Sequence, residues 1–304
     1  MAKSKFDIDN NSNPQPEDAT NTAAKPTDQS TTNLNAFDAH SNDVVVIADP
    51  SPVIILFGSG ASGKTMTLIR LTRYLIQQGY QVEPEKTFRD ARDMHYLKMC
   101  NDFTSLVNST KAPGSNTAID FMLVKVMDKW GRPVCQLLEA PGEHYFDKAV
   151  PTRQFPAYIN TISHRNNRRT WVFIVEKDWE NQSDRSNFAQ KITDLQQQYV
   201  MTQDKVIFTC HKADKHGSLI TRGRYNVPLF FKAISNQYPN IFSRYVNTNP
   251  ITKLWQKYNF DFVVFSAGSF SDDGKGGQNY NESNPSNPAS LWESILKTVK
   301  GGWM

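Results

Sequence analysis

Residues 58–65 carry the clearest chemical signal in the sequence. They match the pattern G-x-x-x-x-G-K-[ST], follow an apolar run and open a segment with helical spacing. Glycines allow backbone N–H groups to turn inward around a phosphate, Lys64 can span two phosphates, and the Thr65 hydroxyl can ligate Mg²⁺. The flanking strand and helix make a chance match less frequent. The residues predicted to contact the phosphates are Gly58, Ser59, Gly60, Ala61, Ser62, Gly63, Lys64, Thr65 and Met66.

The elements expected to position this loop belong to an α/β sheet. Four short apolar runs predict buried parallel strands, at residues 53–57, 171–175, 206–209 and 260–265. Two further runs, at residues 121–127 and 134–138, are joined too tightly for anything but an antiparallel pair. We therefore expect a three-layer P-loop NTPase fold, with a mostly parallel six-stranded sheet, one antiparallel edge strand and helices on both faces.

Composition divides the chain of 304 residues into a tail and one domain. Residues 1–42 are polar and almost without aliphatic side chains, which predicts a disordered N-terminal tail. Residues 43–304 are expected to form the folded domain, with a helical insertion at about 85–112. Residues 271–288 are rich in Gly, Asn, Ser and Pro without periodicity, which predicts a mobile loop.

Charge and cysteine usage exclude several classes of function. A net charge of +4 is mild for this length, and the basic stretch at residues 164–169 lacks interleaved aromatics, so we expect no nucleic-acid partner. The three cysteines are widely spaced and predict no disulfide framework, and no His/Cys spacing suits zinc. Without an apolar span or lipidation motif, the chain is expected to be cytoplasmic with no direct membrane anchor.

Three later segments each follow a predicted strand. Residues 139–144 read Glu-Ala-Pro-Gly-Glu-His, residues 210–214 read Cys-His-Lys-Ala-Asp, and residues 266–268 read Ser-Ala-Gly. The carboxyl ends of parallel strands meet at one edge of a sheet, where ligands bind. With the phosphate loop, these segments give four elements in a fixed order at that edge.

In this order and placement the chain resembles the Ras-like GTPase superfamily, over about residues 44–299. The resemblance implies binding of GTP and GDP with Mg²⁺. It implies that Glu139 stands at the position of a metal-holding Asp, with Gly142 as a γ-phosphate sensor. Asp214 would accept hydrogen bonds from guanine N1–H and its amine, donors that adenine lacks, while the stem of Lys212 packs on the base. The implied base contacts are completed by His211, Ser266, Ala267 and Gly268.

The chain departs from the family pattern at three of these positions. Glu139 lengthens the usual Asp by one methylene, and His211 stands where Asn is usual. Glu143 occupies the place of a water-orienting Gln, and its charge would be repelled by a γ-phosphate unless protonated or turned away. His144 could orient the water instead, or could be a solvent-facing residue of a mobile switch segment.

A threonine that would complete the metal site remains ambiguous in the sequence. Thr117 lies just before the predicted hairpin, as a switch-one threonine should, whereas Thr87 is closer to the spacing of minimal family members. Arg153 could act as an arginine finger in cis, but it is one arginine among many.

The sequence therefore predicts a Mg²⁺-dependent guanine nucleotide-binding switch that hydrolyses GTP slowly and works with a protein effector or regulator. Lys64, Gly142, Glu143 and His144 are the candidate catalytic residues, and Thr65, Thr117 and Glu139 the candidate metal ligands. Two alternatives stay open: a nucleotide-dependent scaffold that does not hydrolyse, and a P-loop ATPase or small-molecule kinase.

Overall fold

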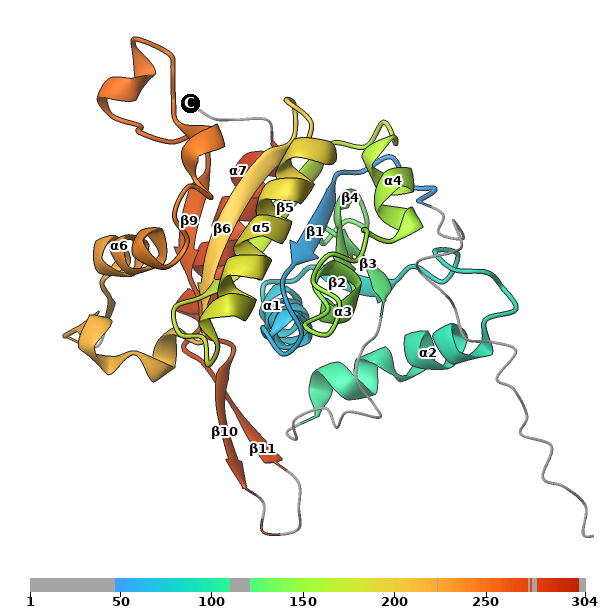
Figure 1. The fold of residues 1–304 in the computed structure, drawn as a ribbon. Coiled ribbons are helices and arrows are strands. Elements are labelled where there is room, and N and C mark those ends of the chain that lie inside the picture. The colour runs from blue at the N-terminus through green and yellow to red at the C-terminus, as the bar shows by residue number, and fades with distance from the viewer. Residues whose placement is uncertain (1–46, 110–120, 223, 273, 275–277, 301–304) are drawn as a thin grey trace, which may run out of the picture. The chain divides into compact units, whose positions relative to one another are not determined.

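A computed structural model describes residues 47–109, 121–222, 224–272, 274 and 278–300. Its centre is a seven-stranded sheet in the order β2-β3-β4-β1-β5-β6-β9 (Figure 1). Strands β4, β1, β5, β6 and β9 run parallel, and β3 is antiparallel to both of its neighbours. The strands are β1 (Val53–Phe57), β2 (Gln81–Pro84), β3 (Met122–Met127), β4 (Pro133–Glu139), β5 (Arg169–Glu176), β6 (Lys205–His211) and β9 (Asp261–Val264).

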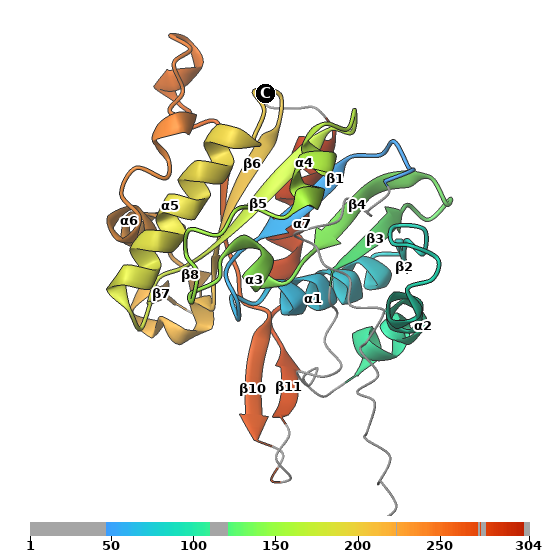
Figure 2. The same ribbon diagram turned by 45° about the vertical axis from the view of Figure 1, so that its right-hand side comes forward.

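Helices connect these strands and cover both faces of the sheet. Helix α5 covers one face and α7 the other (Figures 1 and 2), and α1 packs beside α7. The helices are α1 (Lys64–Gln77), α2 (Met94–Asn108), α3 (Gly142–Tyr145), α4 (Ala157–Ser163), α5 (Gln182–Gln198), α6 (Val227–Gln237) and α7 (Ser286–Val299). Short 3₁₀ helices span Ala213–Lys215, Gly217–Leu219, Ser243–Tyr245 and Thr252–Leu254.

The central strand explains why the phosphate loop begins at a fixed place. All five residues of β1 are buried, as expected for a strand covered by helices on both sides. Phe57 at its end packs on Tyr145 and Phe173, with ring centroids 4.5 and 5.4 Å apart. This packing fixes the point from which the loop departs. Among the described helices, none combines the length and apolar character required to cross a membrane.

The mostly parallel sheet with helices on both faces is confirmed, but two details of the prediction were wrong. The sheet has seven strands, and the antiparallel strand β3 is not at the edge. Strand β2 lies outside it and pairs Val82 with Val126. Its four residues, Gln-Val-Glu-Pro, contain one aliphatic side chain. A strand this short gives no apolar run in the sequence and is held by its backbone pairing with β3.

Residues 271–288 were predicted to form a mobile loop, but their described part contains strand and helix. Strands β10 (Gly268–Asp272) and β11 (Gln278–Glu282) form an antiparallel hairpin, and α7 begins at Ser286. Phe270 stacks on Tyr280 across the hairpin, with centroids 5.5 Å apart. Besides this hairpin and the β3–β4 pair, β7 (Ile220–Thr221) pairs antiparallel with β8 (Arg224–Tyr225). The expected helical insertion contains α2, and residues 1–42 lie outside the described part.

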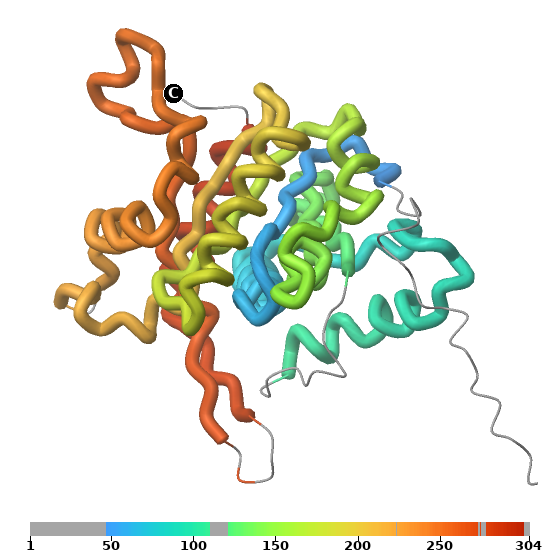
Figure 3. The backbone as a smooth tube through the Cα atoms, viewed as in Figure 1, coloured from blue at the N-terminus to red at the C-terminus, as the bar shows by residue number. Residues whose placement is uncertain are grey.

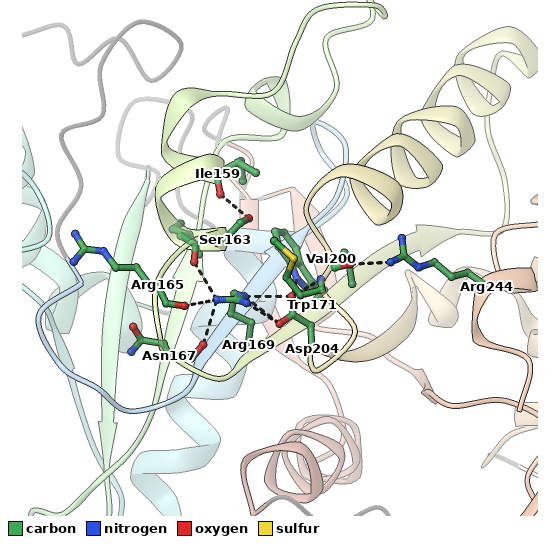
Figure 4. Close-up of polar contacts among 11 residues, drawn as sticks. Ile159, Ser163, Arg165, Asn167, Arg169, Trp171, Val200, Asp204 and Arg244 are labelled. Carbon is green, nitrogen blue, oxygen red and sulfur yellow. Dashed lines mark hydrogen bonds and ion pairs between the residues drawn. The ribbon is translucent and has the colours of Figure 1, made fainter. Parts of the chain in front are cut away.

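The basic stretch at residues 164–169 ends in a buried arginine, which is the first residue of β5. Arg169 is buried and pairs with Asp204, with Nη2 3.1 Å from Oδ1 (Figure 4). Arg169 also donates to the Arg165 carbonyl, and Trp171 Nε1 donates to Asp204 at 3.0 Å. The pair thus has the additional hydrogen bonds that buried charges require. It ties β5 to the turn before β6.

Candidate nucleotide-binding site

The phosphate loop has the backbone of an anion-binding nest. Ala61 and Gly63 have left-handed φ values of +56° and +93°, and α1 begins directly after Gly63. Gly63 has no side chain to cap the first turn, so the amides of that turn remain for a ligand. A Cβ on Gly58 would lie 2.6 Å from Ser62 Oγ and 3.1 Å from Ile174 Cβ, so a side chain there would force its neighbours to move. Residues 58–63 thus form the predicted cradle. Met66 is half-buried in α1 and packs against the core.

Lys64 lies within this cradle. Its side chain is buried, and Nζ donates to the carbonyls of Gly58 at 3.0 Å and Ser59 at 2.8 Å. Burial lowers the pKa of the ammonium, and the carboxylates of Glu139, Glu143 and Glu176 act against that shift. Lys64 Nζ therefore lies at the carboxyl end of β1, against the carbonyls of the loop.

Thr65 and Glu139 meet as the metal prediction requires. The Thr65 hydroxyl donates to Glu139 Oε1 at 3.0 Å, although the two residues are 74 positions apart. Glu139 is buried at the end of β4, beside β1. The longer side chain still brings its carboxylate to the phosphate loop.

Gly142 and Glu143 lie directly against the phosphate loop. A Cβ on Gly142 would come within 2.1 Å of Gly60 N, so only glycine permits this approach. The Glu143 carboxylate extends over Gly60, with Oε1 2.7 Å from where a Cβ of Gly60 would lie. The exposed carboxylate of Glu143 is thus turned toward the loop.

His144 lies elsewhere in the same short helix. Its ring is half-buried and contacts Phe121 and Tyr158, with centroids 5.5 and 5.8 Å apart. The alternative of a solvent-facing side chain was therefore wrong. These aromatic contacts do not point to a role in orienting water, so His144 remains a catalytic candidate by position only.

His211 supports the phosphate loop from below. Its ring is buried, Nε2 lies 3.2 Å from Thr67 Oγ1, and Nδ1 is 3.1 Å from where a Cβ of Gly63 would lie. The ring stacks on Phe265 at 4.9 Å. Burial, with the charges of Lys212 and Lys64, lowers the pKa of His211 to about 3, against a hydrogen bond to the Ser62 backbone. The ring is neutral at pH 7.

Lys212 is engaged by a residue that sequence reasoning missed. Its Nζ forms an ion pair with Glu176 Oε2 at 2.6 Å, and its backbone is left-handed, with φ +54°. Glu176 ends β5 and is the register partner of His211. Its place at the carboxyl end of a predicted strand was the available signal. Because the Lys212 ammonium is paired with Glu176, only the aliphatic stem of this side chain would be left to pack on a base.

Asp214 and Ser266 come together from different strand ends. Ser266 Oγ donates to Asp214 Oδ1 at 2.6 Å, and Asp214 is exposed while Ser266 is buried. The backbone also joins the segments, because Ala213 N donates to the Phe265 carbonyl at 3.3 Å. The two predicted base-reading segments therefore form one surface.

The hairpin β10–β11 joins this surface to the phosphate-loop helix, which was not foreseen. The Ala267 carbonyl accepts from the Tyr280 hydroxyl at 2.7 Å and from Ser283 N at 3.0 Å. A Cβ on Gly268 would lie 2.1 Å from the Asn281 carbonyl oxygen, so the hairpin begins there with glycine. On the same hairpin, Glu282 forms ion pairs with Arg70 and Arg73 of α1.

Two other candidates, Thr87 and Arg153, are not brought to the site. Thr117 lies outside the described residues. Thr87 is exposed and donates to Glu85 Oε1 at 2.8 Å, away from the phosphate loop. Arg153 pairs with Asp147 at 3.1 Å, which does not support an arginine finger.

The fold and the site define the class of the protein. A phosphate loop after the central strand of a mostly parallel, helix-covered sheet, with polar residues at neighbouring strand ends, constitutes a P-loop NTPase fold. No family model matches the sequence, and no curated protein matches it.

Solved structures with some similarity include GTP-binding proteins. The one described as nucleolar GTP-binding protein 1 from Plasmodium falciparum is 14% identical, with a TM-score of 0.39, over 85% of this chain and 91% of its own. A bacterial selenocysteine-specific elongation factor is 12% identical, with a TM-score of 0.37, and the match covers 84% of this chain and 29% of that one. SelB from Methanococcus maripaludis, in complex with a GTP analogue, is 11% identical, with a TM-score of 0.34, over 85% and 36%.

This chain spans about a third of the two elongation factors. Because every TM-score is below 0.5, these similarities carry no argument about function, and the site geometry must do so.

Proposed function

We propose that the protein binds GTP and GDP with Mg²⁺ and hydrolyses GTP slowly as a molecular switch. The observation that carries this proposal is the hydrogen bond from Ser266 to Asp214 at the edge that holds the phosphate loop. It holds a carboxylate that would accept from guanine N1–H and the guanine amine, a pair of donors that adenine lacks.

The chain's own groups have separate tasks in this proposal. Amides of residues 58–65 and the Lys64 ammonium would bind the phosphates and stabilise the charge that develops on the transferred group. Asp214 would orient the base, and neutral His211 would hold the phosphate loop against β6. Gly142, which lies against Gly60 of the loop, would sense the γ-phosphate through its amide.

The residues at the loop fit a magnesium ion. Thr65 supplies a hydroxyl and Glu139 a buried carboxylate already in contact with it, and hard oxygen ligands of this kind suit Mg²⁺. Among the described residues, no group of three His, Cys, Asp or Glu side chains forms a metal cage. Magnesium in P-loop sites is held mostly by phosphates and water, so one carboxylate and one hydroxyl suffice. When bound, the ion would neutralise phosphate charge.

Calorimetric titration with GDP, a GTP analogue and ADP tests the assignment. Hydrogen bonds to a charged acceptor contribute about 1.5–3 kcal/mol each, so we expect GDP to bind about a hundredfold or more tighter than ADP. Asp214→Asn replaces an acceptor with a donor. The variant should bind GDP more weakly than the parent and should prefer xanthosine diphosphate, which carries a C2 carbonyl in place of the amine. Asp102→Asn, an exposed carboxylate of α2, is the matched control.

Equal affinity for ADP and GDP, or an unchanged preference in Asp214→Asn, would remove the guanine assignment and leave the ATPase alternative.

A scaffold that does not hydrolyse is the second candidate, and the position of Glu143 favours it. Its carboxylate lies over Gly60, where a γ-phosphate would approach. A carboxylate there supplies no neutral amide to orient an attacking water, so hydrolysis would be disfavoured. Single-turnover hydrolysis separates the candidates: a rate equal to that of free GTP, with tight binding, supports the scaffold. Glu143→Gln should raise the rate if this carboxylate limits a working GTPase.

A further inference from the structure

Residues 246–259 project from the sheet with an unusual display of apolar side chains. This segment, called the projecting loop below, lies between the 3₁₀ helix Ser243–Tyr245 and β9, at the end of the sheet opposite the β10–β11 hairpin (Figures 1 and 3). Ile251, Leu254 and Trp255 are 67%, 78% and 68% exposed. Large apolar side chains gathered at one exposed tip indicate an interaction surface.

Hydrogen bonds inside the projecting loop hold its backbone in one shape. The buried Asn247 amide donates to Thr252 Oγ1 at 2.8 Å and to the Gln256 carbonyl at 2.9 Å. Asn249 Oδ1 accepts from the backbone amides of Ile251 and Thr252. The apolar tip is therefore preorganised, which reduces the entropy lost on docking.

The base of the projecting loop is fixed to the domain. Tyr245 and Tyr258 pack on Phe260, with ring centroids 6.0 and 5.2 Å apart. Arg244 donates to the Val200 carbonyl at 2.9 Å, beside the buried Arg169 pair (Figure 4). These contacts anchor the projecting loop to the folded domain.

The projecting loop itself is basic. Residues 246–260 contain no Asp or Glu, and their two cations are Lys253 and Lys257. Lys253 and Lys257 are exposed and flank the apolar side chains. The next acidic residue in the sequence, Asp261, accepts from Ser294 at 2.7 Å and pairs with Lys297. An anionic partner would therefore meet two exposed cations and no carboxylate within the projecting loop.

We propose that the projecting loop docks the protein onto an anionic lipid bilayer. Three side chains on a convex tip are too few for a stable protein interface, which takes about 800 Å² and roughly 20 to 30 residues from each partner. A bilayer accepts an apolar protrusion of any shape, and Trp favours the interface between headgroups and acyl chains. Lysines beside the tip would attract acidic headgroups and keep their ammonium groups in water.

The placement leaves the candidate nucleotide site accessible. The phosphate loop follows the carboxyl end of β1, whereas the projecting loop precedes the amino end of β9, and these strands run parallel within the sheet. The two sites are at opposite ends. The docking proposal does not depend on which nucleotide binds, or on whether one is hydrolysed.

Flotation of the full chain with lipid vesicles tests the proposal. Vesicles of phosphatidylcholine alone are compared with vesicles containing about one-third phosphatidylglycerol, at low and moderate salt. We expect binding to the acidic vesicles, at least tenfold weaker to neutral ones and weakened by salt. The double variant Leu254→Ser/Trp255→Ser should lose at least tenfold in affinity with an unchanged melting temperature, because both side chains are exposed. Met94→Ser, an exposed apolar residue of α2, is the control and should bind as the parent does.

Several results would overturn the proposal. Absence of vesicle binding by the parent chain refutes it, as does equal loss in the double variant and in Met94→Ser. If vesicles do not bind, but the double variant changes the sedimentation coefficient of the parent, the tip is a contact between copies of the chain. Equal binding to neutral and acidic vesicles refutes the role of the lysines, which Lys253→Ala/Lys257→Ala tests directly.

Discussion

The buried histidine of the candidate site makes stability depend on pH in a defined direction. His211 has a folded-state pKa of about 3, against about 6.5 in an unfolded chain. Between pH 6.5 and pH 3, His211 therefore binds a proton in the unfolded state but not in the folded state. The stabilisation is complete above pH 6.5 and is lost as pH falls toward 3.

The magnitude follows from linkage between protonation and folding. Each pH unit inside this window costs about 1.4 kcal/mol, so acidification from pH 7 to pH 5 should cost about 2 kcal/mol through this residue alone. By pH 3 the loss reaches about 5 kcal/mol, comparable with the total stability of many domains. Carboxylates also titrate in this range, so the histidine must be isolated by a variant.

His211→Asn is that variant, since it removes the titrating group and keeps a polar side chain beneath the phosphate loop. Urea unfolding of both proteins at pH 7 and pH 5 gives two differences in the free energy of unfolding. Between pH 7 and pH 5 the free energy of unfolding should fall by about 2 kcal/mol more in the parent than in the variant. If both lose the same amount within about 0.5 kcal/mol, the ring is not buried and neutral as described, and the reasoning is refuted.

Two further predictions concern packing and charge. Gly142→Ala places a methyl group 2.1 Å from Gly60 N, so we expect a loss of about 1–3 kcal/mol in unfolding free energy and weaker nucleotide binding. Gly217→Ala, with no atom within 4 Å, should be nearly neutral in both measurements, and equal effects would refute the contact. Arg169→Ala leaves Asp204 buried without its cation and should cost about 3–5 kcal/mol in urea unfolding. The exposed neighbour Arg168→Ala should change stability little, and a similar loss there would show that the ion pair does not matter.

Local sequence signals predicted the parts of the site that depend on local structure. The phosphate loop requires a buried strand, a glycine-rich turn and a helix start in immediate succession, and residues 53–64 supply all three. The contact between Thr65 and Glu139 was also expected, because parallel strands bring their carboxyl ends to one edge.

Side-chain contacts that depend on the register between strands could not be predicted from the sequence. Glu176 meets Lys212 because β5 and β6 pair with Glu176 opposite His211, and no local pattern encodes that register. Strand β2 and the β10–β11 hairpin were missed for a related reason. Strand β2 has only four residues and the hairpin is mostly polar, so neither gives the apolar run that marked the other strands.

The two ends of the seven-stranded sheet also bear on aggregation. A long, flat and unpaired outer strand is a template on which other chains can add. Here both outer strands, β2 and β9, have only four residues, and β2 ends in Pro84, which cannot donate a backbone hydrogen bond. Glu83 adds an exposed charge to the β2 edge. The edges of this sheet should therefore resist pairing with strands of other chains.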